Sequence, residues 1–340
     1  MHSPIRRTIM TAIKVLIAVA ILVYLGFKGR DAFAQLSAKS INWWMMAAAL
    51  FVTLLMAGFS YLRWHILIRA LGIDARLMDT LRLGALGFAL NFVAPGSIGG
   101  DFFKAIFLAH GHPGRRPEAI ATVIADRVVG LLTMLLLASG GILLAGLLHT
   151  DSRSLQILYR TILIVSVVTW LVCIVLVLFG SLTGPRVTQR VANVPVAGKA
   201  IARMMATVQV FRTRKRMLVA ALVASLAMAV CFVGSYWLVA EGLPIDAPSF
   251  QQHMMIVPIA GNIGTTPLTP SGLGTTELAI EKLYQKMPGV TSTPGDGTLV
   301  GIGRRMTDIA VALIGLAFYL THRKEVAEVF AEAEEAAEAE

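Results

Sequence analysis

The chain alternates long apolar stretches with short polar ones, and the apolar stretches have the length of membrane-spanning helices. About 20 consecutive apolar residues cross the ~30 Å hydrocarbon core of a bilayer as an α-helix. We therefore predict an all-α, polytopic membrane bundle with six spanning helices, near Met10–Phe27, Trp43–Leu62, Ala119–Leu148, Tyr159–Phe179, Leu218–Ala240 and Leu299–Leu320.

The first window also has features of a secretory signal, because Ala32-Phe33-Ala34 follows it like a signal-peptidase site. Three charged residues, Lys28, Arg30 and Asp31, lie between the apolar run and that site, where a signal peptide has small neutral residues. We predict an uncleaved helix.

Two further apolar regions, Leu81–Ala109 and Met254–Tyr284, are interrupted by helix-breaking residues. The first has a proline and three glycines within Asn91–Lys104, and the second has two prolines and two glycines within Thr266–Glu277. Proline lacks the amide donor of a helix and clashes with the preceding turn, so neither region forms one straight helix. About 30 residues are also too few for two full crossings with a loop between them. We predict two re-entrant hairpins, with two short tilted spans as the alternative.

The charges between the apolar stretches predict which side each loop faces, because cytoplasmic loops carry an excess of lysine and arginine. Ser181–Met217 has eight basic residues and no acid, whereas Glu241–Gln252 has two acids and no base. We therefore place the first loop in the cytoplasm and the second outside. By the same counting, Arg63–Arg82 is a cytoplasmic loop, the first hairpin opens to the cytoplasm and the second to the outside, and both termini are cytoplasmic.

The order of elements repeats along the chain as a helix, a broken hairpin and a helix with charges inside its apolar run. Repeat one is predicted at about residues 43–148 and repeat two at about residues 218–320. Pro95 precedes Arg127 by 32 residues, and Pro270 precedes Arg305 by 35. Because a single helix joins the copies, we expect them to be inverted in the membrane. In transporters of that design, broken helices meet at the substrate site.

Composition agrees with a membrane protein, because 56% of the 340 residues are hydrophobic and only 15% are charged. The net charge is +10 although Glu325–Glu340 contains seven glutamates. We predict a transmembrane domain at 1–324 and an acidic cytoplasmic tail at 325–340. A basic excess of this kind favours anionic lipid over nucleic acid as the partner. We expect a bacterial inner membrane and membrane lipids as partners, and we leave a homo-oligomer open.

Charges inside apolar helices are the first candidates for function, because an intramembrane charge is costly without a partner or a wet cavity. Asp126 and Arg127 lie about eight residues into their predicted helix. A snorkelling Arg127 that reaches the headgroups is the alternative. In the last helix, Asp308 follows Arg304 and Arg305 by one turn, so an ion pair within the helix is expected beside a role in binding.

The two broken loops supply the remaining candidates. A helix that restarts near Asp101 points unpaired amides into the bundle, and such a helix start attracts phosphate. Lys104 follows one turn later as a point charge. Threonine hydroxyls precede Glu277 in the second loop, where a structural role for Glu277 is the simpler interpretation. The predicted substrate-binding residues are Asn91, Pro95, Gly99, Gly100, Asp101, Lys104, Asp126, Arg127, Thr266, Pro270, Gly272, Gly274, Glu277, Arg304, Arg305 and Asp308.

The sequence shows no recognisable motif for hydrolysis, redox chemistry or metal binding. Cys173 and Cys231 each lie inside an apolar run, where a thiol packs as a small hydrophobe. The seven histidines are scattered. Neither a nucleotide P-loop, nor a nucleophile elbow, nor a dinucleotide fingerprint is found. We therefore predict no metal, no cofactor and no catalytic residue.

The motifs resemble those of a known family, the membrane region of lysylphosphatidylglycerol synthases and the stand-alone proteins described as flippase-like. The resemblance covers about Trp43–Leu320 and rests on Asn91-x-x-x-Pro95-x-x-x-Gly99-Gly100-Asp101, on Asp126-Arg127, and on Pro267-x-x-Pro270-Ser271-Gly272-Leu273-Gly274-x-x-Glu277. It implies a polytopic inner-membrane protein that binds or translocates lipids, including aminoacylated phosphatidylglycerol or glycolipids. Ser271 departs from the family, which often has glycine there.

A second departure concerns the synthase activity, because the chain printed here reaches Glu340 without a soluble aminoacyltransferase domain. We therefore do not carry that activity over. The leading hypothesis is a lipid flippase-like protein that is not an enzyme, in which Lys104, Arg127, Arg304 and Arg305 hold phosphate. The alternatives are a membrane-embedded transferase with Asp101 or Glu277 as base, and a small-solute carrier.

Overall fold

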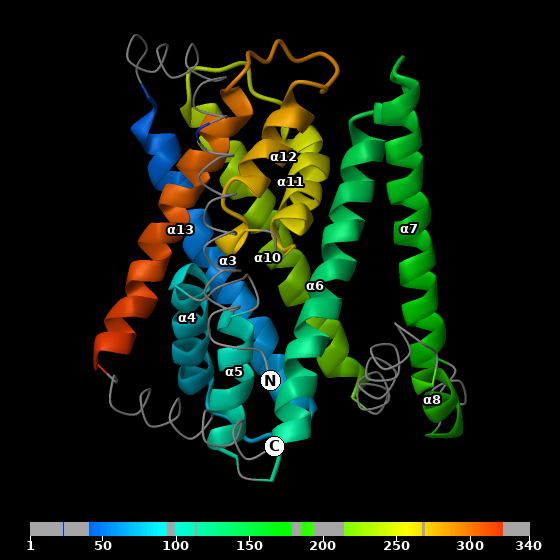
Figure 1. Cartoon of the computed structure of the whole chain (residues 1–340), viewed down its shortest axis with the longest axis vertical. Helices are drawn as coiled ribbons and strands as arrows, with labels where there is room; N and C mark the ends of the chain where they lie inside the picture. The colour runs from blue at the N-terminus through cyan, green and yellow to red at the C-terminus, as the bar shows by residue number, and fades with distance from the viewer. Residues whose placement is uncertain are drawn as a thin grey trace, which may run out of the picture.

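A computed structural model describes residue 23 and residues 41–93, 99–112, 114–178, 185–193, 214–266 and 269–321. These residues form an all-helical bundle (Figure 1). The helices are α3 (Trp43–Ala70), α4 (Leu77–Val93), α5 (Gly99–His110), α6 (Arg116–Leu144), α7 (Arg153–Leu178), α8 (Pro185–Ala192), α10 (Lys215–Gly242), α11 (Phe250–Gly264), α12 (Thr275–Tyr284) and α13 (Asp296–Thr321), with short 3₁₀ turns η1 (Leu147–His149) and η3 (Pro270–Gly272).

Four of the described helices, α3, α6, α7 and α10, are long and apolar enough to cross a membrane. The predicted sixth span corresponds to α13, which has 26 residues but is not among the four. The reason is that Arg304, Arg305 and Asp308 interrupt its apolar run. The predicted first span and the acidic tail lie outside the described residues, apart from residue 23.

Each broken region forms a pair of short helices that pack together, α4 with α5 and α11 with α12, as a hairpin does, and their re-entrant placement in a membrane stays a prediction. The arms α4 and α5 have 17 and 12 residues, against 28 in α3, so neither reaches from one end of the bundle to the other. Figure 1 shows α4 and α5 in the lower half of the bundle and α11 and α12 in the upper half. The two hairpins therefore approach each other near the middle.

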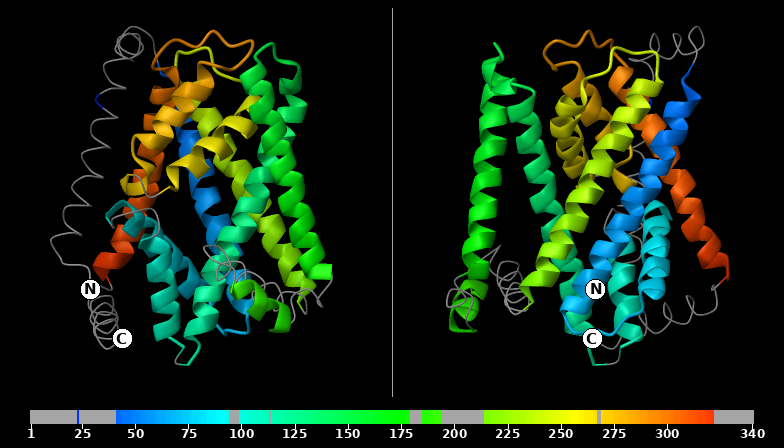
Figure 2. Two further views of the ribbon diagram at one scale, coloured as in Figure 1. Left: turned by 45° about the vertical axis from the view of Figure 1, so that its right-hand side comes forward. Right: turned by 180° about the vertical axis from the view of Figure 1, so that it is seen from behind.

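The packing of the helices pairs each hairpin with a helix from the other half of the chain. Helices α3 and α10 run side by side along their length at the centre, as the view from behind in Figure 2 shows. Hairpin arm α11 packs along α6, and hairpin arm α4 packs along α13. If α3 is taken as the equivalent of α10, the α4–α5 hairpin as that of α11–α12, and α6 as that of α13, then the contact between α11 and α6 is the equivalent of the contact between α4 and α13. This is the pattern that an inverted repeat predicts, whereas the repeat boundaries stay a prediction.

The outward faces of the bundle are apolar. Helix α7 packs against α6 at the edge of the bundle (Figures 1 and 2) and exposes Ile164, Val167 and Leu171. Helices α10 and α13 likewise expose Val223 and Leu313. Large apolar side chains gathered on the outside of a long helical bundle suit contact with lipid tails, so the chain is a multi-pass membrane protein.

A glycine on α6 allows the close approach of α11. A β-carbon at Gly141 would lie 2.7 Å from the Gln251 carbonyl oxygen and the Met255 amide nitrogen. At the neighbouring Gly140 the nearest atom is the flexible end of Met254, at 3.3 Å. Backbone atoms cannot give way as a methionine methyl can, so the two positions respond differently to the same substitution.

We expect Gly141→Ala to lower the free energy of unfolding by about 1–3 kcal/mol, the usual cost of overpacking. Gly140→Ala is the matched control and is expected to have little effect. Unfolding in mixed micelles, followed by tryptophan fluorescence, measures both variants. Equal stabilities for the two variants would contradict the close approach of α6 and α11.

Candidate functional site

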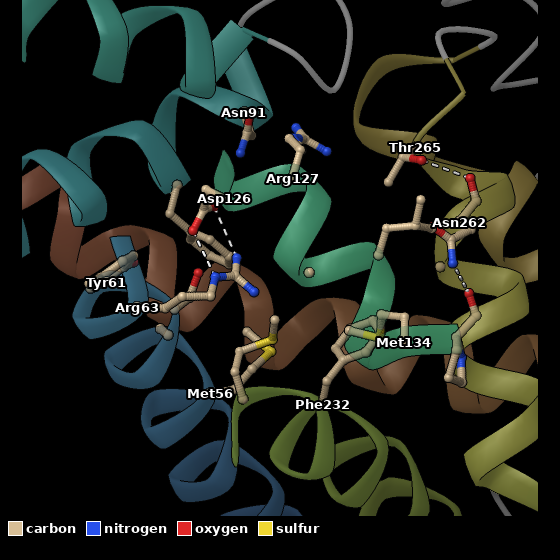
Figure 3. A pocket seen from close by; sticks show the side chains of 18 of the residues that line it. Met56, Tyr61, Arg63, Asn91, Asp126, Arg127, Met134, Phe232, Asn262 and Thr265 are labelled. Carbon is tan, nitrogen blue, oxygen red and sulfur yellow. Dashed lines mark hydrogen bonds and ion pairs between the residues drawn. The ribbon is translucent and has the colours of Figure 1, made fainter. Parts of the chain in front are cut away.

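A cavity of about 450 Å³ lies inside the bundle, between α3, α4, α5, α6, α10 and α11 (Figure 3). Its lining combines polar and charged groups with an apolar part. The polar and charged lining residues are Ser60, Tyr61, Arg63, Asn91, Lys104, Asp126, Arg127, Asn262 and Thr265. The apolar part includes Met56, Phe88, Leu131, Met134, Met228, Phe232 and Pro258.

One wall of the cavity carries cations from the first hairpin and the helix after it. Lys104 of α5 and Arg127 of α6, two of the four residues that the sequence suggests as phosphate ligands, both line the cavity. The Lys104 ammonium lies 5.5 Å from the centre of the Trp64 ring. Such a cation–π contact helps to position the Lys104 charge in the cavity wall.

Asn91 joins the two arms of the first hairpin at this wall. Its side-chain oxygen accepts a hydrogen bond from the Gly100 amide at 2.9 Å. A β-carbon at Gly100 would lie 1.9 Å from the Gly87 carbonyl oxygen, so only glycine permits this crossing of α4 and α5. Gly100 therefore allows the two arms to approach closely, and Gly99 begins α5 one residue earlier.

A buried ion pair stands beside the cations. Arg63 of α3 donates to both carboxylate oxygens of Asp126, with Nε at 2.7 Å and Nη2 at 3.0 Å. Its third donor reaches the Ser225 hydroxyl of α10 at 2.9 Å. Both residues are more than nine-tenths buried, so the pair connects α3, α6 and α10 in the cavity wall.

Sequence reasoning missed Arg63 because a basic residue after an apolar run was interpreted as the start of a cytoplasmic loop. That assignment was wrong, since α3 continues to Ala70. The signal was present in the residues that follow Arg63, where Trp64, Leu67 and Ile68 keep the helical spacing of apolar positions and are buried.

The tips of the two hairpins touch each other. The Ser271 hydroxyl donates to the Asn91 carbonyl oxygen, which connects η3 to the end of α4. Arg305 donates from Nη1 to the Ser271 carbonyl oxygen at 3.3 Å and from Nε to Glu277 at 2.8 Å. The other Glu277 oxygen accepts from the Gly274 amide at 2.7 Å, which caps the start of α12. We call Asn91, Ser271, Glu277 and Arg305 the tip contact.

Arg304 and Asp308 form the ion pair expected within α13, at 2.5 Å. The Arg304 side chain is almost fully buried and also donates to Ser235 at 2.8 Å and to Thr307 at 3.1 Å. Its guanidinium lies over the rings of Phe232 and Tyr236 as well. These contacts account for Arg304 by the packing of α13 against α3 and α10, and Arg304 itself does not line the cavity.

The predicted site residues thus separate into groups. Asn91, Lys104, Asp126 and Arg127 line the cavity, whereas Glu277 and Arg305 hold the tip contact. Gly272 and Gly274, at φ of 66° and 84°, form the turn before α12. Thr266 donates its hydroxyl to the Ile263 carbonyl oxygen, and its neighbour Thr265 lines the cavity in its place. Pro95 and the side chains of Asp101 and Pro270 lie outside the described residues.

One family model covers the cavity, both hairpins and most of the rest of the chain. The model for the lysylphosphatidylglycerol synthase transmembrane region matches residues 11–327. The chain belongs to this family. A comparison with curated proteins gave no match. The resemblance first drawn from the two Pro/Gly loops is therefore confirmed. The family is named for the transmembrane region of a lipid-modifying enzyme, and this relates the protein to lipid handling.

Proposed function

We propose that this protein is a lipid flippase-like protein, which binds phospholipid or glycolipid headgroups in the cavity and carries them between the leaflets. The observation that supports the proposal most directly is the cavity itself, with Lys104 and Arg127 in its wall, enclosed by a bundle whose outer faces are apolar. A phosphate in the cavity meets cations between protein walls, where a lower effective dielectric constant strengthens their attraction. Acyl chains stay against the outer faces.

In this proposal the tip contact separates the cavity from the opposite half of the bundle. A headgroup that leaves towards the other leaflet has to pass between Asn91 and Ser271, which are hydrogen-bonded. The two hairpins would therefore act as gates and move apart when the lipid passes. We propose no energy source for this movement.

The geometry weakens the alternative of a transferase with Glu277 as base. Both Glu277 oxygens accept hydrogen bonds, one from Arg305 and one from the Gly274 amide, and the residue is 2% exposed. A general base needs an oxygen within reach of the substrate. A small-solute carrier remains the other alternative, and transport that does not depend on lipid would favour it.

We further propose a bacterial inner membrane, with the α4–α5 hairpin opening to the cytoplasm and both termini on that side. Helix α10 enters from the basic end of the bundle, since Arg214, Lys215 and Arg216 lie at its start. This agrees with the excess of positive charge on cytoplasmic loops. Accessibility of single cysteines at Asp74 and Thr291 to an impermeant reagent tests the orientation, and labelling of both from one side would contradict it.

The proposed function predicts a loss of lipid movement when the cations are neutralised. We expect Arg127→Gln and Lys104→Gln each to slow the flipping of fluorescent phosphatidylglycerol in proteoliposomes at least tenfold, because a hydrogen bond to a charged group contributes about 1.5–3 kcal/mol. Arg160→Gln is the matched control, since Arg160 is exposed on α7. Dithionite quenching of the outer-leaflet fluorophore measures the rate.

The outcome that would contradict the proposal is equally specific. Wild-type protein that neither binds nor moves any phospholipid rules out lipid handling by this cavity. Wild-type movement that is unchanged in Arg127→Gln and in Lys104→Gln rules out the cation wall as the headgroup site.

A further inference from the structure

The wall of the cavity that faces the cations is built differently. It comes from the end of α11, where Asn262 and Thr265 line the cavity (Figure 3). The Asn262 amide nitrogen donates to the Pro258 carbonyl oxygen at 2.8 Å. Only the NH₂ group of an asparagine can donate to a carbonyl, so this bond fixes which way round the amide lies. The amide oxygen therefore stands as a hydrogen-bond acceptor in an exposed side chain.

Thr265 strengthens the acceptor character of this wall. Its hydroxyl donates its one hydrogen to the Asn262 carbonyl oxygen at 2.8 Å. Towards any other group, the hydroxyl oxygen then acts as an acceptor. The Thr265 hydroxyl and one of the two Asn262 N–H groups thus donate back into their own helix, and the Asn262 amide oxygen does not take part in these bonds.

The opposite wall carries the reverse chemistry. Lysine and arginine side chains have donors and no acceptor, so Lys104 and Arg127 suit a phosphate. A phosphodiester oxygen is itself only an acceptor and gains nothing from the Asn262 amide oxygen. A ligand that satisfies both walls combines a phosphate with a hydrogen-bond donor in the same headgroup.

We propose that Asn262 selects lipids whose phosphodiester carries a hydroxyl or ammonium group over lipids whose phosphodiester ends in a plain alkyl group. The donor of the headgroup binds the Asn262 amide oxygen while the phosphate binds the cation wall. The inference rests on the proposed function and adds a residue that the sequence did not indicate. In this proposal the second half of the chain recognises the donor of the headgroup through Asn262, and the first half binds the phosphate through Lys104 and Arg127.

Three dioleoyl lipids test the inference in detergent micelles, by competition against a fluorescent phosphatidylglycerol. Phosphatidylglycerol supplies hydroxyl donors and phosphatidylethanolamine an ammonium, whereas phosphatidylethanol has the same charge as phosphatidylglycerol and no donor. We expect the wild-type protein to bind at least one donor lipid about 2- to 12-fold more tightly than phosphatidylethanol, the fold-change that corresponds to one net hydrogen bond. The lipid that shows the preference identifies the donor.

Two substitutions at the same position separate recognition from folding. Asn262→Leu removes the acceptor and is expected to bring the preference below twofold without changing the affinity for phosphatidylethanol. Asn262→Asp also loses the bond to Pro258 but keeps acceptor oxygens, so the preference for a donor lipid should persist. Thermal unfolding of both variants reports any loss of structure common to them.

The possible results are distinguishable from failure of the proposed function. Equal wild-type affinities for all three lipids overturn the inference, and so does an Asn262→Leu variant that weakens the three equally or keeps the wild-type preference. If Lys104→Gln and Arg127→Gln also leave phosphatidylethanol binding unchanged, the proposed function itself falls. If they weaken it while Asn262→Leu has no effect on preference, only the inference about Asn262 is lost.

Discussion

Replacing Asp126 by alanine is expected to lower the free energy of unfolding by about 3–5 kcal/mol, the cost of leaving a buried charge without its partner. Arg63 would remain in the wall between α3, α6 and α10 with its Ser225 contact and no carboxylate. Asp74→Ala is the control, because the Asp74 carboxylate pairs with Arg69 but is 92% exposed. An exposed pair of this kind contributes at most about 1 kcal/mol.

A double substitution tests whether the loss comes from the unpaired arginine. Arg63→Met with Asp126→Ala removes both charges, and Ser225 keeps its bond to the Thr133 hydroxyl at 2.7 Å. Replacing a buried pair by apolar groups is often close to neutral, so the double variant should recover most of the stability. Unfolding of the four proteins in micelles with increasing SDS gives the free energies. A double variant as unstable as Asp126→Ala would refute the explanation.

The helices and the hairpins could be predicted from the sequence because the apolar runs are long and the Pro/Gly interruptions are dense. The ends of the helices and the partners of their charged residues could be predicted less well. Arg63 follows an apolar run as a loop residue would, and only a partner 63 positions later explains its burial. A single sequence shows that Asp126 and Arg127 are neighbours, but not that Asp126 pairs with α3.

The same limit applies to the charges of α13. Arg304 and Arg305 are adjacent and looked equivalent as phosphate ligands, yet one packs against aromatic rings of α10 and the other reaches the tip contact. Adjacent residues on a helix point about 100° apart, so their surroundings differ completely. Which residue faces which neighbour depends on the rotation of the helix, and the sequence of α13 does not specify this rotation.

Ser271 shows how a departure from a family pattern acquires a physical meaning. Its φ of 49° and ψ of 25° lie in the left-handed region, which glycine adopts without strain and other residues at a cost of about 1–2 kcal/mol. Glycine is therefore the expected residue at this position. In this chain the serine hydroxyl donates to the Asn91 carbonyl oxygen, a contact that glycine cannot make. The departure adds a hydrogen bond between the hairpin tips.

The tip contact leads to the second prediction with a large expected effect, a reversible block of lipid movement. Cysteines introduced as Asn91→Cys and Ser271→Cys, in a chain with Cys173→Ala and Cys231→Ala, place one thiol on each of the two residues that are hydrogen-bonded between the hairpin tips. Oxidation is expected to join them and to reduce flipping to the rate of protein-free liposomes, because the gates can no longer separate. Reduction should restore the rate of the untreated double variant.

The comparison within one variant makes the result independent of what each substitution does by itself. The rate before oxidation, after oxidation and after reduction comes from the same proteoliposomes, and the single-cysteine variants control for oxidation of the lipid. Binding of phosphatidylglycerol should survive the cross-link, because Lys104 and Arg127 lie on the side of the cavity formed by α5 and α6. A cross-linked protein that flips lipid as fast as the same protein after reduction of the disulfide would mean that headgroups pass elsewhere. The hairpin tips would then serve only to hold the two halves of the bundle together.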